Sequence, residues 1–485
     1  MSSVPSTVQP VAPRPSALVR RRAAAKVQSG PLRLPVYPGL GIAGALIGSW
    51  LAVAAIPSDP HAAGALRVPS LILAAGLFLA PALAFLRNPR SLFRIEHILA
   101  LSPIYWLLLD TIQGTYHLYG VSREAIEGCF LLIGVFIAAC WAGSALFRFP
   151  LPRLIRRAAS VELSTRVIFG LIVVMFGLAM LKFAIPACFD LGLMIDSLSR
   201  PRWSTPWARG SLGGFNAFLD HLAYFGFVLP CLVVLLAHKV RYTDPRLWVS
   251  SGLTLFLLFF LAQEGGRRII GVVLGAALIY WILLRPRLST SAFVRFALSA
   301  GLLLALFQFM VTYRTVGFGA AFTDDARVRK VEGIHVDDNF LRLGQIIDIF
   351  PDRVPFVYEK QIVFTLVRPI PRVFWPGKPT DPGYDFSSLV GEYGVSLTSS
   401  CLGEFYASFG VLAIILGGLL YGALARFFAP LLTRLANPER LLVYSFAALV
   451  LFAGVRSTIE LVLMSYGLIA WIVALILFRA RIRST

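Results

Sequence analysis

The sequence contains few charged residues. Asp, Glu, Lys and Arg make up 14% of the 485 residues, whereas soluble domains carry about 25%. Hydrophobic residues make up 57%, and the mean hydropathy is +0.75. This composition excludes a chain of ordinary soluble domains. Because apolar runs cover almost the whole length, the sequence predicts an all-α polytopic membrane protein.

Acidic residues and cysteines are also scarce. There are 25 acidic residues against 45 Lys and Arg, which gives a net charge of +20. The basic residues lie between apolar runs, so we expect membrane lipids and phosphorylated lipids as partners and no nucleic acid. The five cysteines lack the spacing of metal ligands, and no metal or cofactor is expected. Cys188 and Cys401 fall in predicted loops, where a disulfide is open but has no support.

The apolar runs are long enough to cross a membrane. A spanning helix needs about 20 apolar residues, and about twelve runs approach that length. The third is the weakest because it includes His97 and Asp110. A basic tail over 1–37 is predicted to be disordered, followed by one membrane domain over 38–485. The predicted spans are 39–56, 68–86, 95–112, 128–147, 167–185, 212–237, 247–263, 269–284, 292–311, 409–429, 441–455 and 458–478.

Every alternate connection between these runs is basic, as in Arg87 to Arg94, Arg148 to Arg166 and Arg426 to Arg440. The positive-inside rule therefore predicts that both termini are cytoplasmic. The other connections are then external. The longest, over 313–408, is predicted to be folded and functional. Its segment 338–350 has the pattern of an amphipathic helix lying on the membrane, and 361–367 predicts a second short helix.

Several arginines are predicted on the external side, against the charge rule. Arg267 and Arg268 follow two glycines in a tight turn, where backbone N–H groups and guanidinium groups would form an anion site. The alternative is a turn with arginines that reach toward lipid head groups. Arg314 follows a predicted span, and Arg456 lies in the last external turn. Glu460 is four residues after Arg456, so a local ion pair is equally compatible.

Ionisable residues within the predicted spans lie near their external ends. They favour a cavity open to the outside over a transport path, because ion-coupled transporters place such residues near the midplane. One adjacent pair could instead be an interhelical polar contact. The residues are Asp110, Asp220, His221, Glu264 and Glu460, and the pair is Asp220 and His221.

The stretch 367–410 contains R-P-I-P-R-V-F-W-P-G-K-P and, later, G-E-F-Y-A-S-F-G. With these motifs, its many spans and its large late loop, the chain resembles the Wzy-type O-antigen polymerases. The specific likeness covers about residues 314–422. The resemblance implies a GT-C-like membrane glycosyltransferase that needs no metal. Such an enzyme joins undecaprenyl-diphosphate-linked repeat units into a surface polysaccharide on the periplasmic face of the bacterial inner membrane.

The resemblance also implies roles for residues. Glu404, Arg372 and Arg368 are expected to be catalytic. The expected ligands of the diphosphate or sugar are Arg267, Arg268, Arg314, Trp375, Lys378 and Arg456. The implied partners are a lipid-linked glycan donor and acceptor, with a chain-length regulator as a further candidate.

The sequence leaves the identity of the general base open. Glu404 is the first candidate, and a carboxylate that stabilises a helix start is the alternative for it. Rival bases are Asp348, Asp381, Asp385 and Glu392. Two other functions fit the same composition: an O-antigen ligase, which uses the same donor, and a polysaccharide or lipid transporter. A metal-dependent transferase is expected to carry paired acidic residues in its first external loop. This loop contains only Asp59, which counts against that class of enzyme.

Overall fold

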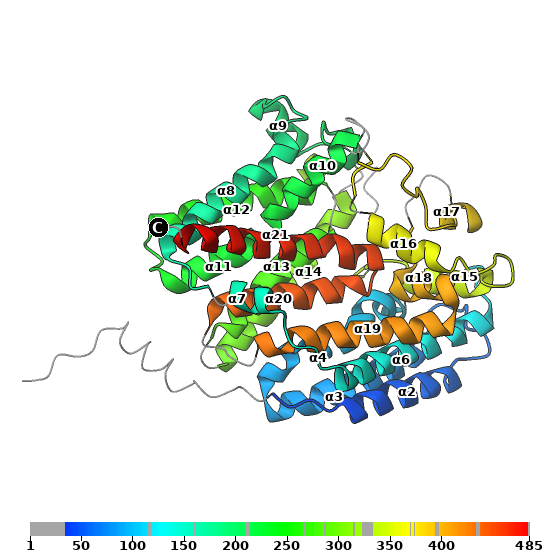
Figure 1. The fold of residues 1–485 in the computed structure, drawn as a ribbon. Coiled ribbons are helices and arrows are strands. Elements are labelled where there is room, and N and C mark those ends of the chain that lie inside the picture. The colour runs from blue at the N-terminus through cyan, green and yellow to red at the C-terminus, as the bar shows by residue number, and fades with distance from the viewer. Residues whose placement is uncertain are drawn as a thin grey trace, which may run out of the picture.

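The computed structural model is all-helical over the residues it describes, without a strand among them. Those residues are 34–114, 118–159, 161–208, 214–264, 267–285, 288–313, 316–322, 333–368, 370–372, 374–392, 397–432 and 437–483. The expected tail lies outside this range except for its last residues, of which Leu34 is buried. Figure 1 shows the long helices running side by side.

Nine helical segments within the described part of the chain are long and apolar enough to cross a membrane, so the chain is a polytopic membrane protein. Three further predicted spans coincide with helices of 17 residues, α2, α13 and α20. The nine are α3 (Arg67–Arg87), Ile95–Gln113, α6 (Arg123–Leu146), α8 (Thr165–Ala184), Phe218–Lys239, α12 (Pro245–Gln263), α14 (Thr290–Tyr313), Ser400–Leu431 and Thr458–Ile476. The shorter three are α2 (Pro38–Ala54), α13 (Arg267–Leu283) and α20 (Pro438–Gly454).

Some spans contain more than one helical element. Ile95–Gln113 consists of α4 (Ile95–Pro103), the π-helical η2 (Ile104–Leu108) and α5 (Leu109–Gln113). The remaining elements outside the connection 313–408 are η1 (Pro89–Phe93), α7 (Arg153–Ala158), α9 (Leu191–Ser197), η3 (Arg202–Ser204), α10 (Gly214–Ala223), η4 (Tyr224–Val228), α11 (Leu229–Lys239), α19 (Val411–Phe428), η6 (Ala429–Leu431) and α21 (Thr458–Arg483).

Side-chain caps define where several spans begin. The Ser122 hydroxyl accepts a hydrogen bond from the Ala125 N–H at 3.1 Å, at the start of α6. At the start of α20, the Asn437 side chain accepts from the Arg440 N–H at 3.0 Å, and Pro438 occupies the first helical position. These are preferred residues at their positions, because they satisfy or remove N–H groups that the helix leaves free.

Helices α6 and α19 pack at very short range. A side chain at Gly422 would overlap the backbone of Cys140, and one at Gly143 would overlap the backbone of Leu419. Glycine on each helix therefore allows the two backbones to touch, as small residues do between membrane helices. Helices α2 and α3 continue this layer along the lower edge of Figure 1.

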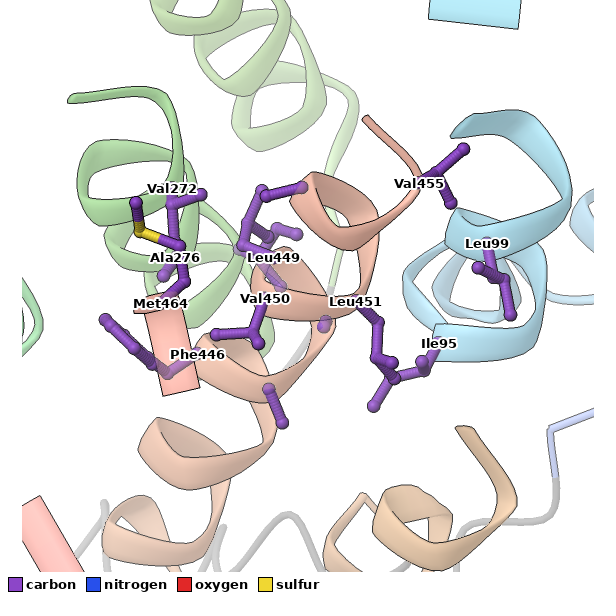
Figure 2. Packing of buried hydrophobic residues seen from close by; sticks show 14 of the residues in the cluster. Ile95, Leu99, Val272, Ala276, Phe446, Leu449, Val450, Leu451, Val455 and Met464 are labelled. Carbon is purple, nitrogen blue, oxygen red and sulfur yellow. The ribbon is translucent and has the colours of Figure 1, made fainter. Parts of the chain in front are cut away.

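The central core lies around α20, which packs against α13, α21 and α4. In Figure 2, Val272 and Ala276 of α13 lie on one side of α20, and Ile95 and Leu99 of α4 lie on the other. Four α20 side chains between them are at most 8% exposed: Phe446, Leu449, Val450 and Leu451.

The connections contact one another in two groups, one at each end of the bundle. At one end, Arg90 donates to the Arg285 carbonyl at 2.6 Å, and the Lys239 ammonium donates to Glu439 at 2.7 Å. At the other end, Gln113 and Ile334 are joined by two hydrogen bonds, of 2.7 and 2.8 Å. We call this second end the loop end. The two groups are those expected for connections that alternate between two sides.

The described parts of the long connection 313–408 lie at the loop end, where α15, α16 and α18 lie together in Figure 1. Its elements are η5 (Phe318–Phe322), α15 (Asn339–Ile349), α16 (Glu359–Val367), α17 (Phe386–Leu389) and α18 (Ser400–Phe409). The predicted helix over 338–350 corresponds to α15, but its apolar face packs on α6 and α18 instead of lying on the membrane. Phe340, Leu343 and Ile346 are at most 2% exposed for this reason. Cys188 and Cys401 are both free thiols, and Cys401 is buried in α18.

Candidate functional site

Three of the predicted arginines meet at the loop end. Arg267 and Arg268 begin α13, and Arg456 lies between α20 and α21. Asp337 joins two of them: Nε of Arg456 is 2.5 Å from one carboxylate oxygen, and Arg267 is 3.5 Å from the other. Arg268 lies 2.5 Å from Oε1 of Glu460. We call these five residues the arginine cluster.

The arginine cluster has an excess of positive charge. Burial alone would raise the pKa of Asp337, but Arg456 and Arg267 lower it below its ordinary value, so this carboxylate stays ionised. Three guanidinium groups then face two carboxylates. In addition, Nη1 of Arg456 is buried and lies 3.6 Å from Oε1 of Glu460, but it makes no hydrogen bond within the described residues. A buried donor without an acceptor is costly, and an anionic ligand would satisfy it.

The segment that carries Asp337 is held in place from several sides. Gln113 of α5 bonds both the N–H and the carbonyl of Ile334. Asp110 accepts from the Val336 N–H at 3.4 Å, and Arg267 donates to the His335 carbonyl at 2.9 Å. The position of Asp337 relative to the arginines is therefore set by fixed backbone contacts.

An apolar cavity of about 300 Å³ extends from the arginine cluster along α13, between α14 and α20. We call it the apolar cavity. Arg267, Arg268 and Arg456 line one end, and the α13 residues that line it continue to Ile279. At 1.5 Å per helical residue this is a length of about 18 Å. Apart from the cluster, the lining is almost entirely apolar or aromatic, with Leu303, Phe307, Leu449 and Phe452 among its residues.

The π-helical element η2 forms part of the cavity wall. It carries Tyr105 and Trp106, which both line the apolar cavity. The Trp106 indole donates to the Phe452 carbonyl at 2.8 Å, and the Trp106 carbonyl accepts from the Asn339 amide at 2.9 Å. Short π-helical stretches occur frequently at functional sites.

Helix α14 forms the outer wall of the apolar cavity. Only 6% of an apolar stretch of 18 residues in α14 is buried inside the protein, whereas the share is 33–72% in the other eight segments. It packs mainly on α13. Among the described spans that line this cavity, α14 is therefore the one least covered by the rest of the protein.

A second cavity, of about 80 Å³, lies on the other side of Arg268, which lines both cavities. We call it the polar cavity. Lys182 of α8 lies 2.7 Å from Asp220 and 2.5 Å from Glu264 in its wall. Its other charged and aromatic lining residues include Glu460, Trp203, Trp207 and Tyr224.

The described residues of the proline-rich stretch 367–380 form hydrogen bonds with one another. The Lys378 ammonium donates to the carbonyls of Arg368 and Ile370 at 2.9 and 2.8 Å. Arg372 donates to the Lys378 carbonyl at 3.0 Å. Burial lowers the pKa of Lys378, and the positive charges of Arg368 and Arg372 lower it further. Trp375 is 41% exposed, and none of the four predicted site residues in this stretch lines either cavity.

Glu404 is in a different environment from the one expected of a base. It is buried in α18 and accepts from the Ser457 hydroxyl at 2.6 Å, from the Thr458 N–H at 2.8 Å and from the Thr458 hydroxyl. Both carboxylate oxygens thus hold the start of α21 in place. Since the same turn carries Arg456, this geometry favours a positioning role for Glu404.

The rival carboxylates also have local partners. Asp348 accepts from the N–H and hydroxyl of Ser122, and Glu392 pairs with Arg342 at 2.5 Å. Asp385 caps α17, and Asp381 accepts from the Gly383 N–H at 2.9 Å. None of them lines either cavity.

The sequence reasoning missed Asp337 and Lys182 and named Arg314, which lies outside the described residues. A signal for Lys182 was available, because it is a cation in the last turn of a span near its predicted external end. Asp337 has no such local signal. Its importance depends on two arginines that are 70 and 119 residues away in the sequence.

Within the described residues, no group of three or more His, Cys, Asp or Glu side chains is arranged to hold a metal ion. Comparison of the chain with protein-family models, curated proteins and solved structures gave no match.

Proposed function

We propose that this protein is a membrane glycosyltransferase whose donor is a glycan linked to a lipid diphosphate. The observation that carries the proposal is the apolar cavity, which ends at Arg267, Arg268 and Arg456. An isoprenoid chain suits the apolar part, and a diphosphate suits the arginines at its end. Guanidinium groups bind phosphate oxygens with a planar fork.

The charge balance supports a role in the chemical step. In glycosyl transfer the bond between the anomeric carbon and the phosphate oxygen breaks, and negative charge builds up on the departing diphosphate. Fixed cations in a site of low dielectric constant stabilise that charge. Arg267, Arg268 and Arg456 supply such cations, and Nη1 of Arg456 makes no hydrogen bond within the described residues.

The exposed outer wall supports entry of the donor from the membrane. The apolar cavity is much smaller than a long isoprenoid chain, so it would hold only the part next to the diphosphate. The rest would extend past α14 into lipid. The low burial of α14 within the protein is consistent with such a path.

Among membrane glycosyltransferases, we propose that this protein is a polysaccharide polymerase. We propose that the chain has twelve spans in a GT-C-like arrangement, in a bacterial inner membrane with both termini cytoplasmic. The loop end then faces the periplasm, where it elongates undecaprenyl-diphosphate-linked repeat units into O-antigen or exopolysaccharide. The motif resemblance at residues 368–379 and 403–410 and the alternation of basic connections support this assignment.

The test uses purified protein in lipid nanodiscs with undecaprenyl-diphosphate-linked repeat units taken from a deletion strain. A polymerase extends these units into a ladder of longer chains. The deletion strain itself should carry surface glycan capped with a single repeat unit. Polymer stranded on the carrier lipid would instead identify a ligase. Absence of both undecaprenyl diphosphate binding and chain elongation would overturn the proposal.

A further inference from the structure

The polar cavity contains a carboxylate oxygen without a partner. The Glu460 side chain is 3% exposed and lines this cavity. Its Oε1 faces Arg268 at 2.5 Å and Arg456 at 3.6 Å, but its Oε2 is buried without a hydrogen-bond donor among the described residues. Leaving a charged acceptor unsatisfied in a buried position is costly, which points to a ligand that donates a hydrogen bond.

The other walls of the polar cavity suit a carbohydrate. Trp207 is buried, with its indole N–H held by Gln263 at 3.0 Å, so its ring is fixed in orientation. Trp203 is 63% exposed and lines the same cavity. Aromatic faces pack against the C–H face of a sugar ring, and carboxylates accept from its hydroxyls. Asp220 and Glu264, both paired with Lys182, supply further acceptors.

The position of Glu460 relates the polar cavity to the diphosphate. Arg268 lines both cavities and binds Oε1 of Glu460. A donor whose diphosphate contacts Arg268 has its anomeric carbon one bond from a phosphate oxygen. Through its contact with Arg268, Glu460 is therefore next to the place where the diphosphate is proposed to bind.

We propose that the polar cavity binds the acceptor sugar, with Glu460 as the base that takes the proton of its attacking hydroxyl. The proposal rests on the proposed function. A bond forms between the acceptor oxygen and the anomeric carbon, and the bond from that carbon to the phosphate oxygen breaks. The electron pair leaves on the lipid diphosphate, which the arginines hold, and the hydroxyl proton moves to Oε2 of Glu460.

Two binding measurements separate the two cavities. Undecaprenyl diphosphate without sugar probes the arginine cluster, and repeat-unit oligosaccharide released from the carrier lipid by mild acid probes the polar cavity. The wild-type protein should bind both. Glu460→Gln should weaken oligosaccharide binding about 10-fold or more. It should keep or tighten diphosphate binding, because it removes a negative charge beside Arg268. Elongation should fall by about 10²–10⁴-fold.

Asp337→Asn is the matched control for charge. This substitution also removes one negative charge from the arginine cluster. Because Asp337 does not line the polar cavity, oligosaccharide binding should be unchanged. Trp203→Ala is a variant that folding should tolerate, since this side chain is mostly exposed. It should raise the KM for acceptor with little change in undecaprenyl diphosphate binding. Trp50→Ala, an exposed tryptophan on α2, should change neither.

The outcomes are distinct. If Glu460→Gln and Trp203→Ala bind oligosaccharide as the wild type does, the polar cavity is not the acceptor site and the inference is wrong. If Glu460→Gln elongates at a normal rate, Glu460 is not the base. If the wild-type protein fails to bind undecaprenyl diphosphate, the proposed function fails, whatever the oligosaccharide measurement gives.

Discussion

Nε of Arg456 lies 2.5 Å from Oδ2 of Asp337, although the two residues are 119 positions apart. The contact ties the α20–α21 connection to the segment before α15. Arg267 approaches the other carboxylate oxygen of Asp337, so one acidic side chain orients two guanidinium groups from different helices. The phosphate-binding geometry proposed for this site depends on that carboxylate.

Asp337 should make the fold sensitive to acid. The arginines hold its folded-state pKa below the unfolded value, which is about 3.9. A depressed pKa stabilises the folded state above the unfolded pKa, and this stabilisation is lost as the pH falls through the folded pKa. Thermal unfolding in detergent between pH 7 and pH 3 should therefore show a steeper acid loss for the wild type than for Asp337→Asn. Asp381→Asn, in an exposed turn, is the control. Parallel curves for wild type and Asp337→Asn would contradict the assignment.

The helices could be predicted from the sequence because hydropathy is a local property. Each of the twelve predicted spans coincides with a helix, even where Asp110 and His97 weakened the pattern. The apolar side of α15 could also be predicted from the sequence, but the elements that cover it could not. That depends on α6 and α18, which lie far away in the sequence.

The candidate site could be predicted only in part. Arg267, Arg268 and Arg456 stood out because they break the charge rule for external turns. The motif arginines Arg368 and Arg372 stood out equally, but the stretch around them closes on its own carbonyls. Turn geometry of this kind, and contacts such as that of Asp337, depend on the folded chain and leave no periodic pattern.

The arginines at the apolar cavity should not tolerate lysine. Lysine keeps the charge but loses the planar fork, and loss of one charge-assisted hydrogen bond costs about 1.5–3 kcal/mol. Elongation by Arg267→Lys or Arg456→Lys should therefore fall about 10- to 150-fold. Arg372→Lys is the comparison, because Arg372 lines neither cavity, and it should stay within about threefold of the wild type. A loss at Arg372→Lys as large as at Arg267→Lys would return the site to the proline-rich stretch.

Glu404 should act through folding. Glu404→Gln turns the charge-assisted hydrogen bonds from Ser457 and Thr458 into neutral ones. Hydrogen bonds to charged groups contribute about 1.5–3 kcal/mol, and neutral ones contribute about 0.5–1.5 kcal/mol. The thermal midpoint should fall, while elongation per folded molecule at low temperature should drop less than in Glu460→Gln. An unchanged midpoint together with abolished elongation would make Glu404 the base instead.

Filling the apolar cavity should block the donor without touching an arginine. Ala300 of α14 lines the cavity, so Ala300→Trp would occupy space needed by the isoprenoid chain. Leu298 lies two residues earlier on the same helix, is 68% exposed and does not line the cavity, so Leu298→Trp is the matched control. Ala300→Trp should weaken binding of undecaprenyl diphosphate about 10-fold or more, because burial of each CH₂ contributes about 0.8 kcal/mol. Binding of the water-soluble oligosaccharide should be unchanged in both variants, since it uses the polar cavity. If Ala300→Trp binds undecaprenyl diphosphate as tightly as Leu298→Trp does, the lipid chain lies elsewhere and the arginine cluster must take its anion from another direction.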